Sequence, residues 1–155
     1  MQLAIVDDDL FLRHQSPEVH PERPERLVAA RTGLATSRFA TQSDEQGTQP
    51  QTDKVASSDE PHVLRLPPRD ATEDELCRVH DAAYLEKLRH IRGHSGHLDA
   101  DTFFSEDSYQ AMLRASGGAL ALAESVTGGD CQYGFGFVRP PGHHARPGSI
   151  GGAVA

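Results

Sequence analysis

Two adjacent histidines, His143 and His144, are the residues whose types and spacing most directly indicate chemistry, and they follow a Pro-Pro-Gly segment. Imidazole titrates near neutral pH, so a histidine side chain can both take up and release a proton. In amide hydrolysis a neutral imidazole can deprotonate the attacking water, and a protonated one can supply the proton that the leaving amine needs. Neighbouring side chains in an extended loop point apart, so both imidazoles serve one site only if the backbone turns, which Gly142 permits. The sequence therefore predicts a proton-transfer site at this position.

A second group of histidines consists of His90, His94 and His97, separated by three and then two residues. Imidazoles are common ligands of transition metals, so a metal site is one interpretation of this spacing. Glycines interrupt the group, and no Cys, Asp or Glu lies between its members. A solvated loop rich in glycine and histidine is the interpretation that we prefer.

The elements that must position these residues alternate between strands and helices. Short apolar runs closed by acids, prolines or glycines predict strands at residues 2–6, 62–66 and 133–138. A proline at a first helical position, a capping box and apolar residues at helical spacing predict helices at about residues 24–35, 72–79, 81–92 and 106–127. This alternation indicates an α/β fold, with a parallel sheet covered by helices on both faces. Ligands bind at the carboxyl ends of the strands in such sheets, and the histidine pair follows the last predicted strand.

The longest predicted helix, which begins after Ser105, contains an apolar stripe and two internal glycines. The stripe consists of Tyr109, Met112, Leu113, Leu120 and Ala123. Gly117 and Gly118 lower the helix propensity, which is tolerable if another backbone packs against them. We therefore expect a close backbone contact at this pair.

Residues 36–61 differ in character from the rest of the chain. Thr, Ser, Gln, Asp, Glu, Gly and Pro dominate them, and large apolar side chains are almost absent. Such a segment cannot bury enough apolar surface to offset the entropy that ordering would cost. We expect a disordered insertion at residues 36–61, with residues 1–155 forming the N-terminal part of a single domain.

The bulk composition excludes several classes of protein. The net charge of −8 argues against nucleic-acid binding, which needs positive charge, and suits a cationic substrate. No run of 18 apolar residues predicts a membrane span, and the first residues lack the basic start and long apolar run of a secretory signal. The two cysteines, Cys77 and Cys131, form no CxxC pattern, so neither a disulfide framework nor a thiolate zinc site is indicated. A cytoplasmic location is expected.

Four segments in order resemble one known family. Residues 136–145, Gly-Phe-Val-Arg-Pro-Pro-Gly-His-His-Ala, are similar to the hallmark of histone deacetylases and bacterial acetylpolyamine amidohydrolases. Residues 20–27, residues 71–85 and residues 98–109 resemble the first loop and helix, the next helical pair, and the loop and long helix of that family. The resemblance implies a partial three-layer αβα parallel sheet of the arginase/deacetylase type.

The resemblance also implies an activity: zinc-dependent removal of acyl groups from amines such as acetyl-lysine or acetylpolyamines. His143 and His144 match the acid–base and electrostatic pair of the family, with His144 as the general base. Arg26 matches an arginine below the site, near a channel associated with the acetate product. Asp101 matches a loop residue that holds the substrate backbone, with Asp99 as the competing assignment.

The chain departs from the family pattern after Ala145. In the family, an Asp-x-His pair and a later Asp hold the zinc, and a Tyr stabilises the oxyanion. Residues 146–155, Arg-Pro-Gly-Ser-Ile-Gly-Gly-Ala-Val-Ala, contain none of these. We therefore expect the N-terminal portion of a deacetylase domain, truncated before the zinc ligands, with no metal ligand of its own.

Three interpretations of function remain open at this point. The first is an acyl-amine hydrolase, or the front part of one. The second is a non-catalytic remnant or a partner subunit of a split deacetylase. An arginase-type manganese hydrolase of related fold is the weakest, because its ligand motifs are absent as well. The oligomeric state is not indicated.

Overall fold

A computed structural model of the chain describes residues 1–16, 20–37, 62–99 and 102–148. Except for its first two residues, the insertion predicted at 36–61 lies outside the described residues. Asp101, one of the predicted site residues, lies outside them as well.

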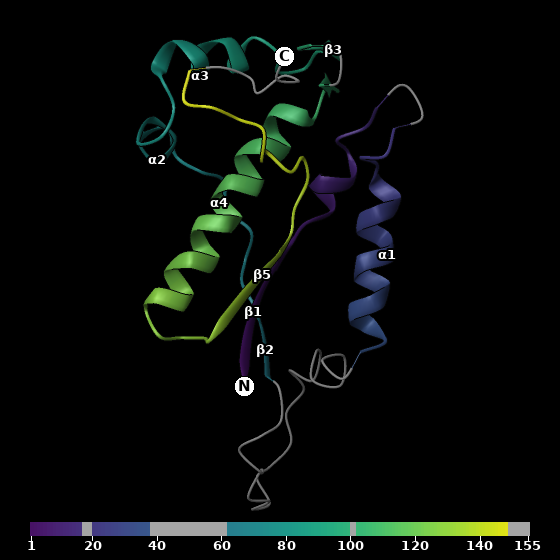
Figure 1. Cartoon of the computed structure of the whole chain (residues 1–155), viewed down its shortest axis with the longest axis vertical. Coiled ribbons are helices and arrows are strands. Elements are labelled where there is room, and N and C mark those ends of the chain that lie inside the picture. Colours follow the sequence, from purple (N-terminus) through teal and green to yellow (C-terminus); the bar gives the residue numbers. More distant parts are fainter. Residues whose placement is uncertain (17–19, 38–61, 100–101, 149–155) are drawn as a thin grey trace, which may run out of the picture.

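The centre of the fold is a parallel sheet of three strands, in the order β2-β1-β5. Strand β1 (Gln2–Asp7) pairs with β2 (His62–Arg65) on one side and with β5 (Tyr133–Phe137) on the other. Its middle residues are fully buried because strands flank it on both edges and helices cover its two faces (Figure 1). All three strands predicted from apolar runs are present, and the predicted α/β class with a parallel sheet is confirmed.

Helices lie on both sides of this sheet, as a layered α/β fold requires. Figure 1 shows α4 (Ser108–Thr127) on one side of the strands and α1 (Pro24–Ala35) on the other. Because side chains alternate along a strand, Ala4 and Val6 pack in a cluster with Leu122 of α4, whereas Ile5 packs in a cluster with Leu27 of α1. The bounds of α1 agree with prediction and Pro24 occupies its first turn as expected, whereas α4 begins two residues later than predicted.

The two glycines inside α4 lie where other parts of the fold approach the helix closely. A Cβ added at Gly117 would lie 2.3 Å from the carbonyl oxygen of Arg69, and one at Gly118 would lie 2.7 Å from Val6. The N–H of Ala71 donates to the carbonyl of Leu113 at 2.9 Å beside this contact. The prediction that another backbone packs against these glycines is confirmed at Gly117, whereas the neighbour of Gly118 is the side chain of Val6.

The apolar stripe predicted for α4 is wrong in part. The residues that the helix buries are mostly small: Ser108, Ala111, Ala115, Gly117, Gly118, Leu122 and Ser125. Ala123 of the predicted stripe is exposed, and Tyr109, Met112 and Leu113 are only half-buried. At Gly117 and Gly118 the helix lies so close to residues 69–71 and to Val6 that a larger side chain does not fit there.

Short elements connect these layers. Helix α2 (Glu73–Cys77) begins with the predicted capping box between Thr72 and Glu75, and α3 (Ala82–Arg89) follows it. Prediction missed a 3-10 helix at Asp9–Leu12 and a two-stranded antiparallel pair, β3 (Gly96–His97) with β4 (Phe103–Phe104). Strands of two residues are too short to show an alternating pattern. Among the described residues, no helix has the length and apolarity of a membrane span.

Candidate functional site

The paired histidines occupy a tight turn just beyond the carboxyl end of β5. The N–H of Ala145 donates to the carbonyl of Gly142 at 2.9 Å, which closes a four-residue turn with His143 and His144 at its centre. Gly142 has a φ of 67°, in the left-handed region that favours glycine. The ring centroids of the two histidines are 4.3 Å apart, with their planes at 61°. The turn therefore brings both exposed imidazoles together, as one site requires.

On its C-terminal side, the histidine turn is attached to the corner between α2 and α3. Nδ1 of His80 lies 3.1 Å from the carbonyl oxygen of Arg146, and since a carbonyl only accepts, Nδ1 carries the proton in this contact. The N–H of Asp81 donates to the carbonyl of Pro147 at 2.8 Å. A Cβ added at Gly148 would lie 2.6 Å from a carboxylate oxygen of Asp81, so the loop approaches this corner closely.

On its N-terminal side, the turn is preceded by a buried arginine. The side chain of Arg139 donates from Nε and Nη2 to the two carboxylate oxygens of Glu22, at 2.5 and 2.7 Å. Its Nη1 donates to the carbonyl of Phe11 at 2.9 Å. Only 4% of Arg139 is exposed. Sequence reasoning treats Arg139 only as part of the motif, because its partner Glu22 lies 117 positions away.

A buried histidine stands on the other side of Glu22. Nδ1 of His14 lies 2.7 Å from Oγ of Ser108, and Nε2 lies 3.6 Å from a carboxylate oxygen of Glu22. The imidazole stacks on Phe103 at a centroid distance of 4.8 Å. Burial lowers the pKa of His14 to about 4, against the opposing pull of Glu22 and with a smaller lowering from Arg139. His14 is therefore neutral at physiological pH, and prediction gave it no role.

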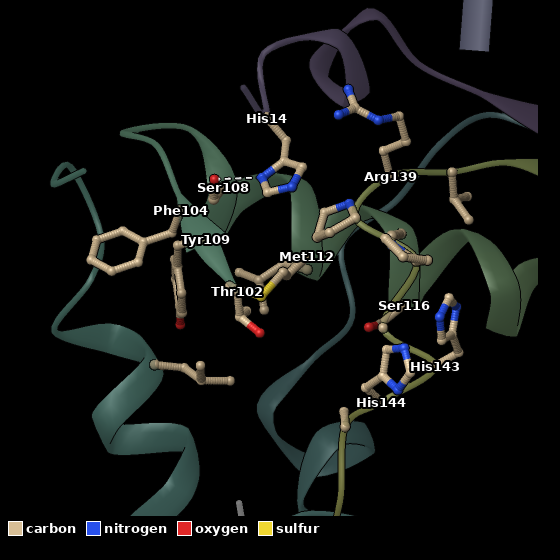
Figure 2. A pocket seen from close by; sticks show the side chains of 18 of the residues that line it. His14, Thr102, Phe104, Ser108, Tyr109, Met112, Ser116, Arg139, His143 and His144 are labelled. Carbon is tan, nitrogen blue, oxygen red and sulfur yellow. Dashed lines mark hydrogen bonds between the residues drawn. The ribbon is translucent and has the colours of Figure 1, made fainter. Parts of the chain in front are cut away.

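These residues line one broad hollow of about 1460 Å³. Its wall includes His143 and His144, Arg26 of α1, and the His14–Glu22–Arg139 cluster. Figure 2 shows the two imidazoles next to one another among the lining side chains. The structure thus brings three of the four predicted site residues to the same hollow, although Arg26 is exposed; the fourth, Asp101, lies outside the described residues.

The lining of the hollow is mostly apolar. Helix α4 contributes Tyr109, Met112 and Ser116 to it, and Phe104 and Thr102 come from the region of β4 (Figure 2). Burial raises the pKa of Tyr84, which also lines the hollow. Such a wall suits a ligand with a long apolar part and few polar groups.

No group of three or more His, Cys, Asp or Glu side chains that could hold a metal ion occurs in the described part of the chain. In the second histidine group, Nδ1 of His90 lies 2.7 Å from the carbonyl of Glu86, and Nδ1 of His94 lies 2.9 Å from the carbonyl of Arg92. Each of these nitrogens is engaged with local backbone. The described residues therefore do not fit a zinc site, at the histidine turn or elsewhere among them.

Comparison with known proteins identifies similar sequences and folds. Residues 20–152 match the histone deacetylase domain. A "Probable deacetylase" of Archaeoglobus fulgidus is 30% identical over 147 residues, covering 95% of this chain and 36% of the relative. The human "Polyamine deacetylase HDAC10" is 32% identical over 144 residues, covering 88% of this chain and 18% of the relative.

The same similarity appears in a solved structure. The crystal structure of the HDA15 HD domain superposes with a TM-score of 0.76 at 29% identity, covering 98% of this chain and 39% of that one. The 155-residue chain thus spans well under half the length of each of these relatives.

Proposed function

Because this chain belongs to the histone deacetylase family, we propose that its histidine turn supplies the proton-transfer groups of an enzyme that hydrolyses acylated amines. The observation that carries the proposal is the turn itself. Gly142 and the hydrogen bond from Ala145 bring the rings of His143 and His144 to 4.3 Å from one another, on the wall of the hollow.

In this proposal His144 is the general base. Its neutral imidazole takes a proton from the water that attacks the amide carbon, and the resulting imidazolium gives a proton to the leaving amine. His143 lies beside it and stabilises charge that develops during the attack. Proton transfer of this kind contributes about 10²- to 10⁴-fold to the rate.

Zinc dependence is part of the proposal, since family resemblance implies it. The metal would polarise the amide carbonyl and the attacking water. Because the described residues do not fit a metal site, residues outside them would hold the ion. The steps proposed for His143 and His144 are proton transfers and need no metal ligand from the described residues.

The proposal also gives Arg26 and Asp101 roles in binding the substrate or its product. Arg26 lines the hollow on the side of α1, which supports a place near the released acid. Asp101 is proposed to hold the backbone of the substrate. We also propose that residues 1–155 belong to a single domain and that the protein acts in the cytoplasm.

The proposed substrates are acetylated lysine side chains and acetylated polyamines. The names of the relatives include a polyamine deacetylase and histone deacetylases. Both classes present an acetylated amine on a segment of methylene groups, which suits the largely apolar wall of the hollow. The net charge of −8 favours the approach of cationic substrates of either class.

The test is an assay of the protein isolated from its own cells, together with whatever copurifies. An acetyl-lysine peptide and an acetylated polyamine are supplied in parallel, and the released acetate is measured before and after treatment with a zinc chelator. We expect release from at least one substrate, loss of release with the chelator, and recovery when zinc is returned. No release from either substrate would favour a non-catalytic subunit and contradict the proposal.

A further inference from the structure

We propose that Glu22 and Arg139 act as a positioning pair, which fixes the direction in which the histidine turn leaves the sheet. The consequence for catalysis rests on the proposed function, whereas the positioning itself does not. The hydrogen bonds of the Arg139 side chain run to Glu22 and the carbonyl of Phe11 and not to His143 or His144, so the pair acts through the backbone that leads to the turn.

The first support is the completeness of the contacts that Arg139 makes. A guanidinium is planar and presents its donors in a fixed fork, so a two-point contact with a carboxylate sets its orientation as well as its position. Arg139 makes that contact with Glu22 and adds a third bond to the carbonyl of Phe11. With 4% of the residue exposed, water can replace little of this. The backbone at the end of β5 is thereby fixed from two segments near the N-terminus.

The second support is the short, stiff connection to the turn. Only Pro140 and Pro141 separate Arg139 from Gly142. Each proline ring restricts its own φ to about −65°, which leaves the connection little freedom. A displacement of Arg139 is therefore passed on to the turn, because flexible residues that could absorb it are lacking between them.

The third support is that two histidines hold Glu22 in place on the side away from Arg139. Its carboxylate faces Nε2 of His14 at 3.6 Å, and its N–H donates to Nδ1 of His20 at 3.0 Å. His14 is anchored to α4 by Ser108, whose Oγ also accepts the N–H of Ser105 at 2.7 Å. This series of side-chain contacts, from α4 through His14 and Glu22 to Arg139, thus connects the turn to the long helix that covers the sheet.

A purely stabilising role for the pair is the alternative that the experiment must exclude. A buried ion pair is weak support for stability as such, because both charges lose hydration on burial. If the pair only stabilised the fold, substitutions would lower the melting temperature and leave the histidine turn unchanged. A positioning role requires that the surroundings of the two imidazoles change while the chain remains folded.

The experiment records the imidazole ¹⁵N–¹H spectra of the full 155-residue chain over a pH series. Signals of the turn are assigned with His143→Gln and His144→Gln. The test variants are Glu22→Gln, which keeps the shape and removes the charge, and Arg139→Lys, which keeps the charge and removes the fork. Glu22→Asp is a milder third variant that keeps the charge but shortens the side chain.

The matched control is Arg31→Lys. Arg31, on α1, is also held by carboxylates and a backbone carbonyl: it makes two bonds to one oxygen of Asp7, one to Asp9 and one to the carbonyl of Asp8. Melting temperatures are measured for all variants by circular dichroism. We expect the imidazole signals of both turn histidines to move in the Glu22 and Arg139 variants and to stay unchanged in Arg31→Lys. Wild-type signals in folded Glu22→Gln and Arg139→Lys would overturn the proposal.

A second arm separates this inference from the proposed function. With the active protein from its own cells, Arg139→Lys is expected to lower kcat by about 10- to 100-fold, as a misplacement on the order of 1 Å does, with a smaller change in KM. If the unsubstituted protein has no activity, the proposed function is refuted. The positioning pair is still tested in that case, because the spectra report the surroundings of the two turn histidines whether or not the protein is active. An unchanged kcat together with unchanged spectra would refute the positioning pair.

Discussion

Nδ1 of His14 lies 2.7 Å from Oγ of Ser108, and the two residues are almost completely buried although 94 positions separate them in sequence. The contact joins the loop after β1 to the first turn of α4. Because burial holds the pKa of His14 at about 4, this bond is made by a neutral imidazole. Protonation of His14 would place a cation near Arg139, in a space that water hardly reaches.

This buried neutral histidine makes stability depend on pH. In the unfolded chain His14 takes up a proton near its ordinary pKa of 6.5, whereas in the folded chain it does so only near 4. Between these values the unfolded state binds more protons, so stability falls as the pH falls. At about 1.4 kcal/mol per pKa unit, the loss attributable to His14 is at most about 3 to 4 kcal/mol.

The measurement is urea denaturation at a series of pH values from 7 down to about 4. We expect the wild type to lose stability more steeply than His14→Asn in this window. His62→Asn, at an exposed histidine at the start of β2, serves as control and should follow the wild type. Parallel curves for wild type and His14→Asn would contradict a depressed pKa at His14.

Gly142 and Gly93 form a matched pair for testing the histidine turn. Both have a positive φ, 67° and 74°, and a Cβ added at either would meet nothing within 4 Å. Alanine at either position should therefore cost about 1–2 kcal/mol through backbone strain alone. Only Gly142→Ala should also alter the imidazole signals of His143 and His144 and reduce deacylation. Equal effects of both substitutions on these signals would show that the turn does not depend on Gly142.

A second pair of glycines tests the close packing of α4. Gly117→Ala would press a methyl group into the backbone at residues 69–71, so we expect a loss of about 1–3 kcal/mol despite the better helix propensity of alanine. Gly33→Ala, on α1, has open space around it and should gain up to about 1 kcal/mol. Chemical denaturation of both variants gives the comparison, and a stabilised Gly117→Ala would contradict the contact.

Local signals explain what could be predicted from sequence. The three strands are compact apolar runs, Pro24 opens α1, and Thr72 with Glu75 forms the capping box that begins α2. Each signal lies within a few residues, and the alternation of elements then restricts the topology to a parallel sheet. The glycine at the histidine turn is a signal of the same local kind.

What could not be predicted depends on residues far apart in sequence. The partner of Arg139 lies 117 positions away, at Glu22, and no pattern near either residue indicates the other. The buried face of α4 was misjudged because its packing uses Ala, Ser and Gly, which an apolar stripe does not reveal. His14 was passed over for a similar reason: its burial depends on Phe103 and Ser108 from another part of the chain.

The zinc content of the purified 155-residue chain provides a further test. None of the family's zinc ligands follows Ala145 in this sequence, and a catalytic zinc normally takes three protein ligands. We expect the purified chain to retain no stoichiometric zinc after dialysis and to release no acetate from an acetyl-lysine peptide. Metal analysis by mass spectrometry checks this, and tightly bound zinc at one equivalent would show that the chain holds a metal site after all.

The most direct test of the account is the deacylation rate of His144→Ala, measured in the active protein isolated from its own cells, beside its zinc content. His62→Ala, at the opposite end of the sheet, is the control. The account predicts that His144→Ala lowers kcat by about 10²- to 10⁴-fold with zinc content unchanged, and that His62→Ala retains the wild-type rate. A His144→Ala variant that keeps the wild-type rate, or that loses its zinc along with its activity, would contradict proton transfer by this residue.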